Sequence, residues 1–297
     1  MKAISTTDLT KYYGATRGIE NLNLDIDEGE VFGFLGPNGA GKTTTMRLLS
    51  ALLRPTRGSA TVLGKDAWHD AAEIKQEMGI LPGDIHLYEN MTGEAFLNYI
   101  TRFRPNKLSV LKDSLAKRFD INLKTRIKDY SKGNRQKIAV IQATMHKPKL
   151  LLLDEPTSGL DPLMQEEFYN LIKEFKADGQ TVFLSSHILP EIEKICDRVG
   201  IVKDGNLVTI EKISDIAAKK VRYVDLTLAE PVNVDEFRVP GVTQIDQIDN
   251  HIRLTVKGEI DPLIKKLAQY DVLDMIAEHA SLEEIFLEYY GKGGRNE

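Results

Sequence analysis

The stretch GPNGAGKTT at positions 36–44 constrains this chain more than any other part of its sequence. It matches the pattern G-x-x-x-x-G-K-[ST], and it stands between an apolar run, EVFGFLG at 30–36, and a helical pattern, TTMRLLSALL at 44–53. A strand, a glycine-rich turn and a helix in this order cradle phosphate groups, and they occur in α/β domains with a parallel sheet. The sequence therefore predicts a phosphate site on an α/β domain.

The residue types of this stretch explain how it would hold phosphate. Small residues allow backbone N–H groups to turn inward, and the start of the following helix adds the positive end of its dipole. Lys42 supplies a point charge at the β- and γ-phosphates and so acts in catalysis, while the Thr43 hydroxyl can ligate Mg²⁺. The predicted nucleotide ligands are Gly36, Pro37, Asn38, Gly39, Ala40, Gly41, Lys42, Thr43 and Thr44. The alternative is a glycine-rich turn without a ligand, whereas a flavin or dinucleotide site would lack the Lys-Thr pair.

A second apolar run, LLLLDE at 150–155, ends in two adjacent carboxylates. Asp154 is predicted to hold the metal, and Glu155 can polarise an attacking water as a general base. Asp154 follows Lys42 by 112 positions, which is too far for two strands joined by one helix. We therefore expect a sizeable inserted segment, roughly over residues 85–145.

The pattern of apolar runs indicates one large domain over residues 1–215. TVFLSSH at 181–187 is predicted as a further buried strand. Asp204 and Gly205, between two apolar runs, predict a two-residue hairpin at an antiparallel edge of the same sheet. The expected first domain thus has a mixed sheet with a parallel core and helices on its faces.

Residues 216–297 are expected to form a small α+β domain. YVDLTL and HIRLTV alternate with period two, whereas DPLIKKLAQ and SLEEIFLEYYG have helical patterns. In the last of these, Ser281 and Glu284 form a capping box and Gly291 stops the helix. The segment holds 10 Lys or Arg against 15 Asp or Glu, which accounts for the whole net charge of −5 and argues against nucleic acid as its ligand.

Two further observations concern the compartment. The single cysteine, Cys196, excludes an internal disulfide and suits a reducing cytoplasm. No apolar run approaches the roughly 18 residues needed to span a bilayer, and the first residues lack the apolar core of a signal peptide. We therefore expect any membrane role to go through a partner.

The segment YSKGNRQK at 130–137 stands shortly before the Asp-Glu strand. Ser131 can cap a helix whose apolar stripe is Ile138, Ile141 and Met145, and such a helix start is a second anion site. With Gly133 and Gln136, Ser131 also resembles the LSGGQ-type signature of ATP-binding cassette (ABC) ATPases, although Lys132 and Asn134 depart from its commonest form.

The resemblance implies a P-loop NTPase fold with an inserted helical subdomain and a head-to-tail dimer with two ATP molecules between the protomers. In such a dimer Ser131 and Gly133 would contact the γ-phosphate bound by the other protomer. Asp161, in SGLD, would bridge the two sites. His187, in SSH, would contact the γ-phosphate and position water, and Tyr13, in TKYYG, would stack on adenine.

The terminal SLEEIFLEYYG further resembles the ATPase subunits of ABC-2 type transporters. This resemblance implies an enzyme that hydrolyses ATP with Mg²⁺ at the cytoplasmic face of the membrane, as a homo- or heterodimer that drives export through separate transmembrane subunits. The transported compound stays open, because its selection would reside in those subunits. The alternatives are a soluble ABC ATPase that acts on nucleic acid or ribosomes, and a binding module without turnover.

The membrane partner is expected beside MTGEAFLNYITRF at 91–103. Phe96, Tyr99 and Phe103 are the apolar candidates for contact with it, although packing inside a helical core would explain each of them equally well.

Gly83 departs from the family pattern. The resemblance implies a glutamine here that ligates Mg²⁺, and the segment LPGD cannot supply it. Three explanations compete: water fills the coordination position, Asp84 reaches in from the next residue, or hydrolysis is slow.

Overall fold

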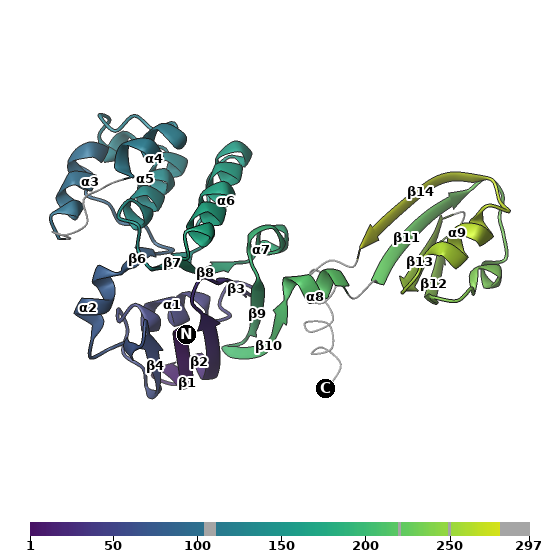
Figure 1. Ribbon diagram of the computed structural model, residues 1–297, viewed down its shortest axis with the longest axis horizontal. Helices are drawn as coiled ribbons and strands as arrows, with labels where there is room; N and C mark the ends of the chain where they lie inside the picture. The colour runs from purple at the N-terminus through teal and green to yellow at the C-terminus, as the bar shows by residue number, and fades with distance from the viewer. Residues whose placement is uncertain (104–110, 219–220, 249–250, 280–297) are drawn as a thin grey trace. The chain divides into compact units, whose positions relative to one another are not determined.

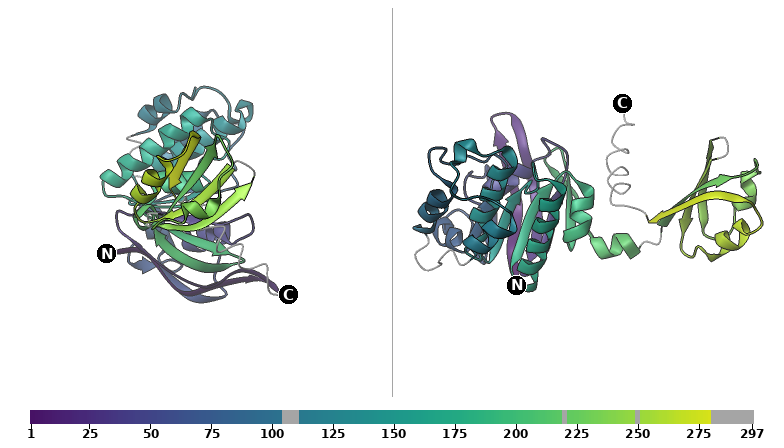
Figure 2. Two further views of the ribbon diagram at one scale, coloured as in Figure 1. Left: turned by 90° about the vertical axis from the view of Figure 1, so that its right-hand side faces the viewer. Right: turned by 90° about the horizontal axis from the view of Figure 1, so that it is seen from above.

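The computed structural model describes residues 1–103, 111–218, 221–248 and 251–279. Contacts within the chain divide it into two units, Met1–Ile210 and Glu211–Glu297 (Figure 1, Figure 2). The boundary expected at residue 215 falls in the short helix α8, Ile213–Ala218, at the start of the second unit.

A largely parallel sheet forms the centre of the first unit. Its six strands have the order β10-β9-β3-β8-β7-β6, and β3, β6, β7, β8 and β9 pair in parallel. Their bounds are β3 Val31–Leu35, β6 Met78–Leu81, β7 Leu150–Asp154, β8 Thr181–Ser186, β9 Arg198–Lys203 and β10 Asn206–Lys212. Every residue of β3, β7 and β8 is buried, as expected for strands covered on both faces. The three predicted buried strands and the α/β class are confirmed.

The hairpin between β9 and β10 is confirmed as well. Asp204 and Gly205 form its turn with φ values of 48° and 78°. Positive φ at both central residues is the mark of a type I′ turn, whose twist matches that of the flanking strands.

All the strands expected in the mixed sheet lie in this six-stranded sheet, and a separate antiparallel sheet, which the sequence did not predict, holds the remaining strands of this unit. Its order is β2-β1-β4-β5, with bounds β1 Lys2–Tyr13, β2 Thr16–Asp27, β4 Arg57–Val62 and β5 Lys65–Asp66. One hydrophobic core joins both sheets to helix α1, Lys42–Leu49: Leu22 and Leu24 of β2 and Phe32 and Phe34 of β3 belong to it. This shared core fixes the loop that precedes α1.

Helices surround the parallel sheet, and three of them lie in the expected insertion. In Figure 1, α3, α4 and α5 gather on one side, and α6 stands beside α5. The bounds are α2 Ala71–Gln76, α3 Gly93–Thr101, α4 Lys112–Arg118, the 3₁₀ turn η1 Ile127–Asp129, α5 Lys132–Thr144, α6 Pro162–Ala177 and α7 Leu189–Ile195. Ser131 caps α5, since its hydroxyl accepts from the Asn134 N–H at 3.2 Å. The stripe of Ile138, Ile141 and Met145 is buried, as predicted.

After the short helix α8, the described part of the second unit is a four-stranded antiparallel sheet with one further helix and a 3₁₀ turn. The strand order is β12-β13-β11-β14, and the bounds are β11 Val221–Leu228, η2 Val234–Phe237, β12 Val242–Ile248, β13 His251–Lys257, α9 Asp261–Leu267 and β14 Val272–His279. Val224 and Leu226 of β11, Leu254 of β13, and Leu263 and Leu267 of α9 share its core. The predicted strands and the helix at DPLIKKLAQ are confirmed, while the helix expected at 281–291 lies outside the described residues. In the described part of the chain, every helix is too short or too polar to cross a membrane.

Candidate functional site

The loop between β3 and α1 has the shape that its glycines allow. Gly41 has a φ of 104°, and a Cβ there would lie 2.7 Å from the Gly18 carbonyl oxygen. A Cβ on Gly36 would lie 2.6 Å from the Val202 carbonyl oxygen. Because α1 begins after Gly41, which carries no capping side chain, the N–H groups of its first turn are left for an external acceptor. An anion fits this position on both hydrogen-bonding and dipole grounds.

Lys42 reaches back over the same loop. Its ammonium donates to the carbonyl oxygens of Gly36 at 2.7 Å and of Pro37 at 3.1 Å, and it lies 3.5 Å from Glu155 Oε1. The residue is only 5% exposed, so its ammonium group is held at the loop and is shielded from water. A buried ammonium at this place attracts phosphate oxygens strongly.

Asp154 ends β7 with both carboxylate oxygens engaged. Thr43 Oγ1 donates to its Oδ2 at 2.7 Å, and the Ser185 hydroxyl donates to its Oδ1. The carboxylate is nearly buried, at 3% exposure. The Thr43 hydroxyl and the Asp154 carboxylate thus lie next to each other. Mg²⁺ is typically bound by a few protein oxygens, and waters complete its coordination.

Glu155 takes an unusual backbone conformation to reach the same place. Its φ of 48° lies in the left-handed region, which is uncommon for a residue with a side chain and is found at functional sites. Its carboxylate lies between two cations or potential cations, 3.5 Å from Lys42 Nζ and 3.1 Å from His187 Nδ1. Glu155 therefore contacts both of the other residues predicted as catalytic.

A pocket of about 300 Å³ opens over the loop. The predicted residues that line it are Tyr13, Asn38, Gly39, Gly41, Lys42, Thr43, Thr44 and Glu155. Tyr13 is 45% exposed, and its hydroxyl lies 3.3 Å from Thr44 Oγ1. The hydroxyl of the neighbouring Tyr12 instead donates to Glu20 at 2.9 Å. Of the two tyrosines, it is Tyr13 whose ring faces the space beside the phosphate loop.

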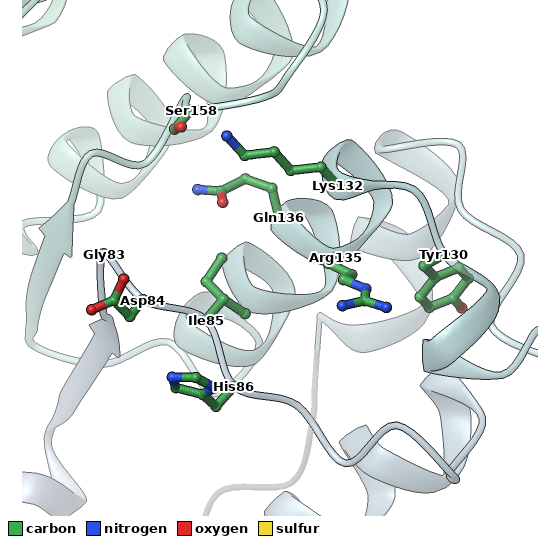
Figure 3. A pocket seen from close by; sticks show the side chains of 9 residues that line it. All are labelled: Gly83, Asp84, Ile85, His86, Tyr130, Lys132, Arg135, Gln136 and Ser158. Atoms are coloured by element: carbon green, nitrogen blue, oxygen red, sulfur yellow. The ribbon is translucent and has the colours of Figure 1, made fainter.

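Six predicted nucleotide ligands do not line this pocket: Gly36, Pro37 and Ala40 belong to the phosphate loop itself, and the other three lie outside it. Ser131 and Gly133 lie at the start of α5, and Asp161 caps α6 by accepting from the Met164 N–H at 3.0 Å. A second cavity, of about 470 Å³, lies on that side of the chain and is bounded by Gly83, by α5 and by Ser158 (Figure 3). Within one chain, the α5 start and the phosphate loop serve different cavities.

Gly83 follows β6 and lies directly against the Asp154 carboxylate. A Cβ at this position would be 2.9 Å from Asp154 Oδ2, so a larger residue here would press on that oxygen. The carboxylate of Asp84 is 78% exposed and pairs with Arg47 at 3.4 Å. The structure therefore directs Asp84 to Arg47, and the backbone of Gly83 lies close to the Asp154 carboxylate.

Sequence reasoning missed two serines. Only His187 was selected from SSH, yet Ser185 binds the Asp154 carboxylate and Ser186 Oγ donates to Glu191 Oε2 at 2.6 Å. Both serines are at most 2% exposed. The available signal was the presence of two hydroxyls at the end of a strand that is otherwise apolar, because buried hydroxyls require partners.

Comparison with known proteins gives concordant results. The family model described as "ABC transporter" matches residues 19–158. The chain is 31% identical to the bacitracin transport ATP-binding protein BcrA of Bacillus licheniformis, over 98% of each chain, and 36% identical to the ABC transporter ATP-binding protein NatA of Bacillus subtilis, over 69% of this chain and 87% of that protein. Among solved structures, the ATP-binding subunit of an ABC transporter superposes with a TM-score of 0.68 at 28% identity, over 73% of this chain and 92% of that one.

Proposed function

Since this chain belongs to the ABC transporter ATP-binding proteins, we propose that it drives export through separate membrane subunits of the ABC-2 type. It binds and hydrolyses ATP. The observation that carries the proposal is the similarity to a bacitracin transport protein along 98% of the chain, which includes the second unit as well as the cassette. The relatives and structures above give no support to a role on nucleic acid or ribosomes.

The contact between Lys42, Glu155 and His187 supports a specific division of labour in hydrolysis. When the γ-phosphate enters the loop, Lys42 turns from Glu155 to the phosphate, which carries more charge. The Glu155 carboxylate is then free to accept a proton from the attacking water. His187, 3.1 Å from that carboxylate, holds the water and the γ-phosphate in line.

Thr43 and Asp154 are the residues proposed to hold Mg²⁺. Their oxygens lie 2.7 Å apart, and Mg²⁺ is commonly bound by one or two protein oxygens while waters complete its coordination. The ion would supply neutralisation of the β- and γ-phosphate charge. With Asp84 paired to Arg47, the account in which water takes the place of the missing glutamine is the one we adopt.

The separation between the two anion sites supports the head-to-tail dimer. Ser131 and Gly133 do not line the pocket of their own phosphate loop, so within one chain they would take no part in binding the same nucleotide. In the proposed dimer, each α5 start closes over the ATP held by the other protomer. ATP then supplies the free-energy difference between open and closed states, and hydrolysis removes it.

An aromatic group on the helical insertion is the proposed contact for the membrane subunit. Tyr99 of α3 packs edge-on against Tyr88 and Phe103, with ring centroids 5.6 and 5.2 Å apart. Tyr88 is 55% and Phe103 65% exposed, whereas Phe96 is 3% exposed. Phe96 is therefore a core residue, and of the two explanations left open for it, packing inside the helical core is the one that applies.

Purification from host membranes tests this function. The tagged chain should bring down a protein with several membrane spans, and Phe103→Ser should weaken that association while leaving the ATPase rate of the purified chain unchanged, because Phe103 lies away from the phosphate loop. Leu52→Ser is the matched control, since Leu52 is 60% exposed on a different element. Recovery of ribosomes or nucleic acid in place of a membrane protein would contradict the export proposal.

A further inference from the structure

The end of β8 carries three polar residues in succession, 185–187, and each faces a carboxylate. The first and third face the two carboxylates of the ATPase site, as described above. The second, Ser186, donates to Glu191 Oε2 at 2.6 Å. Glu191 is 2% exposed and has no role in the proposed chemistry, so this buried carboxyl requires an explanation of its own.

Glu191 is held by a helix that is fixed to the sheet. It lies on α7, whose Ile192 and Cys196 side chains pack against Gly33 of β3. Helix α7 also contacts α6 and β8. Because α7 is packed in this way, the Glu191 carboxyl has a fixed position relative to the loops around it.

Ser186 transmits that position to His187. Its hydroxyl accepts from the Ile188 N–H at 2.9 Å and donates to Glu191, so it ties together the backbone on both sides of the histidine. A turn of this kind is closed only while the serine hydroxyl keeps its orientation. The orientation is set by Glu191, which is the acceptor of the hydroxyl proton.

The same carboxyl also lies near Glu155. Burial raises the pKa of Glu191, the hydrogen bond from Ser186 and the nearby His187 lower it, and the nearby Glu155 raises it. Glu191 therefore stands between the segment that carries the general base and the turn that carries the histidine.

We propose that Glu191 is a positioning residue of the ATPase, whose carboxyl fixes Ser186 and thereby the turn that holds His187 beside Glu155. The inference rests on the roles proposed above for His187 and Glu155. It assigns no contact with nucleotide to Glu191, so its effect belongs to turnover and not to nucleotide binding.

Two substitutions at Glu191 separate positioning from charge. Glu191→Leu removes the acceptor, and we expect kcat to fall about 10- to 100-fold, as for a misplaced catalytic group. Glu191→Gln keeps an acceptor oxygen for Ser186 and should restore most of the rate. The affinity for ATP, measured by equilibrium binding, should stay within about twofold of wild type in both, because the interaction matters only in turnover.

A double-mutant cycle with His187→Ala decides whether Glu191 acts through the histidine. Once His187 is removed, Glu191→Leu should cause no further loss of kcat, because the two residues work as one unit. Independent, multiplicative losses would overturn the inference. If His187→Ala alone keeps the wild-type rate, the proposed function of His187 fails, and that result is distinct from a failure at Glu191.

Ser186→Ala guards against a folding defect in Glu191→Leu. It removes the other partner of the same hydrogen bond with a smaller change in volume, and it should lower kcat to a similar extent. Glu193→Gln, on the exposed face of α7, is the matched control and should match wild type in rate and in melting temperature. Loss of ATP binding in parallel with kcat, or a wild-type kcat in Ser186→Ala, would contradict a positioning role.

Discussion

Helices α1 and α5 differ in whether a side chain caps the unbonded N–H groups of the first turn. At α1 the preceding residue is Gly41, which cannot cap, and the buried Lys42 adds a cation. At α5 the Ser131 hydroxyl already accepts from the Asn134 N–H. The first helix start can therefore bind phosphate with all the N–H groups of its first turn, whereas at the second one of these N–H groups is already taken by the cap. In the proposed dimer, the first helix start would supply most of the affinity for ATP, and the second would add contacts only when the partner protomer closes.

The largest expected effect separates chemistry from binding at α1. Glu155→Gln keeps the size of the side chain but cannot accept the proton, so kcat should fall about 100- to 10,000-fold, the usual contribution of a general base. ATP should still bind, because α1 and Lys42 are unchanged, and the ATP-bound protein should elute as a dimer in size-exclusion chromatography. Unimpaired turnover would remove Glu155 as the base.

A mixing experiment tests whether α1 and α5 must come from different chains. Lys42→Ala and Ser131→Ala should each abolish most of the activity as pure proteins. Mixed at equal amounts, they should regain about a quarter of the wild-type rate, because half of the dimers are mixed and each mixed dimer has one intact site. No recovery, with heterodimers demonstrated by two different tags, would contradict the head-to-tail arrangement.

A comparison of two helix caps tests the difference between a structural cap and a functional one. The Thr92 hydroxyl caps α3 by accepting from the Ala95 N–H at 3.1 Å, much as Ser131 caps α5. Replacement of either residue by Ala should cost about 1 kcal/mol in the free energy of unfolding, measured with urea. Only Ser131→Ala should also lower the ATPase rate. Equal losses of rate in the two variants would mean that Ser131 acts only as a helix cap.

The smallest expected effect concerns the cavity near Gly83. Asp84→Ala should change the Mg²⁺ concentration for half-maximal ATPase by less than about twofold, because an exposed carboxylate paired with Arg47 contributes little. Thermal stabilisation by Mg-ADP should be unchanged as well. A large loss of Mg²⁺ dependence would show that Asp84 takes part in the metal site, and it would contradict the explanation in which water replaces the missing glutamine.

Much of the first unit could be predicted because the central strands of its parallel sheet are short and largely apolar. β3, β7 and β8 are buried on both faces, so their sequences are recognisable as buried strands. The glycine-rich loop follows β3, and the Asp-Glu pair stands at the end of β7. The sheet of β1 and β2 escaped prediction. Its two long strands pair with several register shifts, and such bulges break the period-two alternation that a sequence pattern requires.

The site shows the same limit in a different form. Motif residues could be assigned by their spacing, but Ser185, Ser186 and Glu191 act through contacts between α7, β7 and β8 that depend on the tertiary fold. Phe96 and Phe103 lie on one helical pattern with the same residue type, yet one is buried and the other exposed. Which face of a short helix is covered depends on the neighbours that the fold supplies.

The contact between Lys42 and Glu155 has a consequence for product release. The Glu155 carboxylate lies 3.5 Å from Lys42 Nζ, the ammonium that phosphate would bind. This carboxylate therefore competes with every phosphate ligand for Lys42. It competes best against the ligands that make the fewest other contacts. Free phosphate and ADP, which lack the full set made by ATP, should be displaced by the enzyme's own side chain, so the same carboxylate that begins a cycle helps to clear the site at its end.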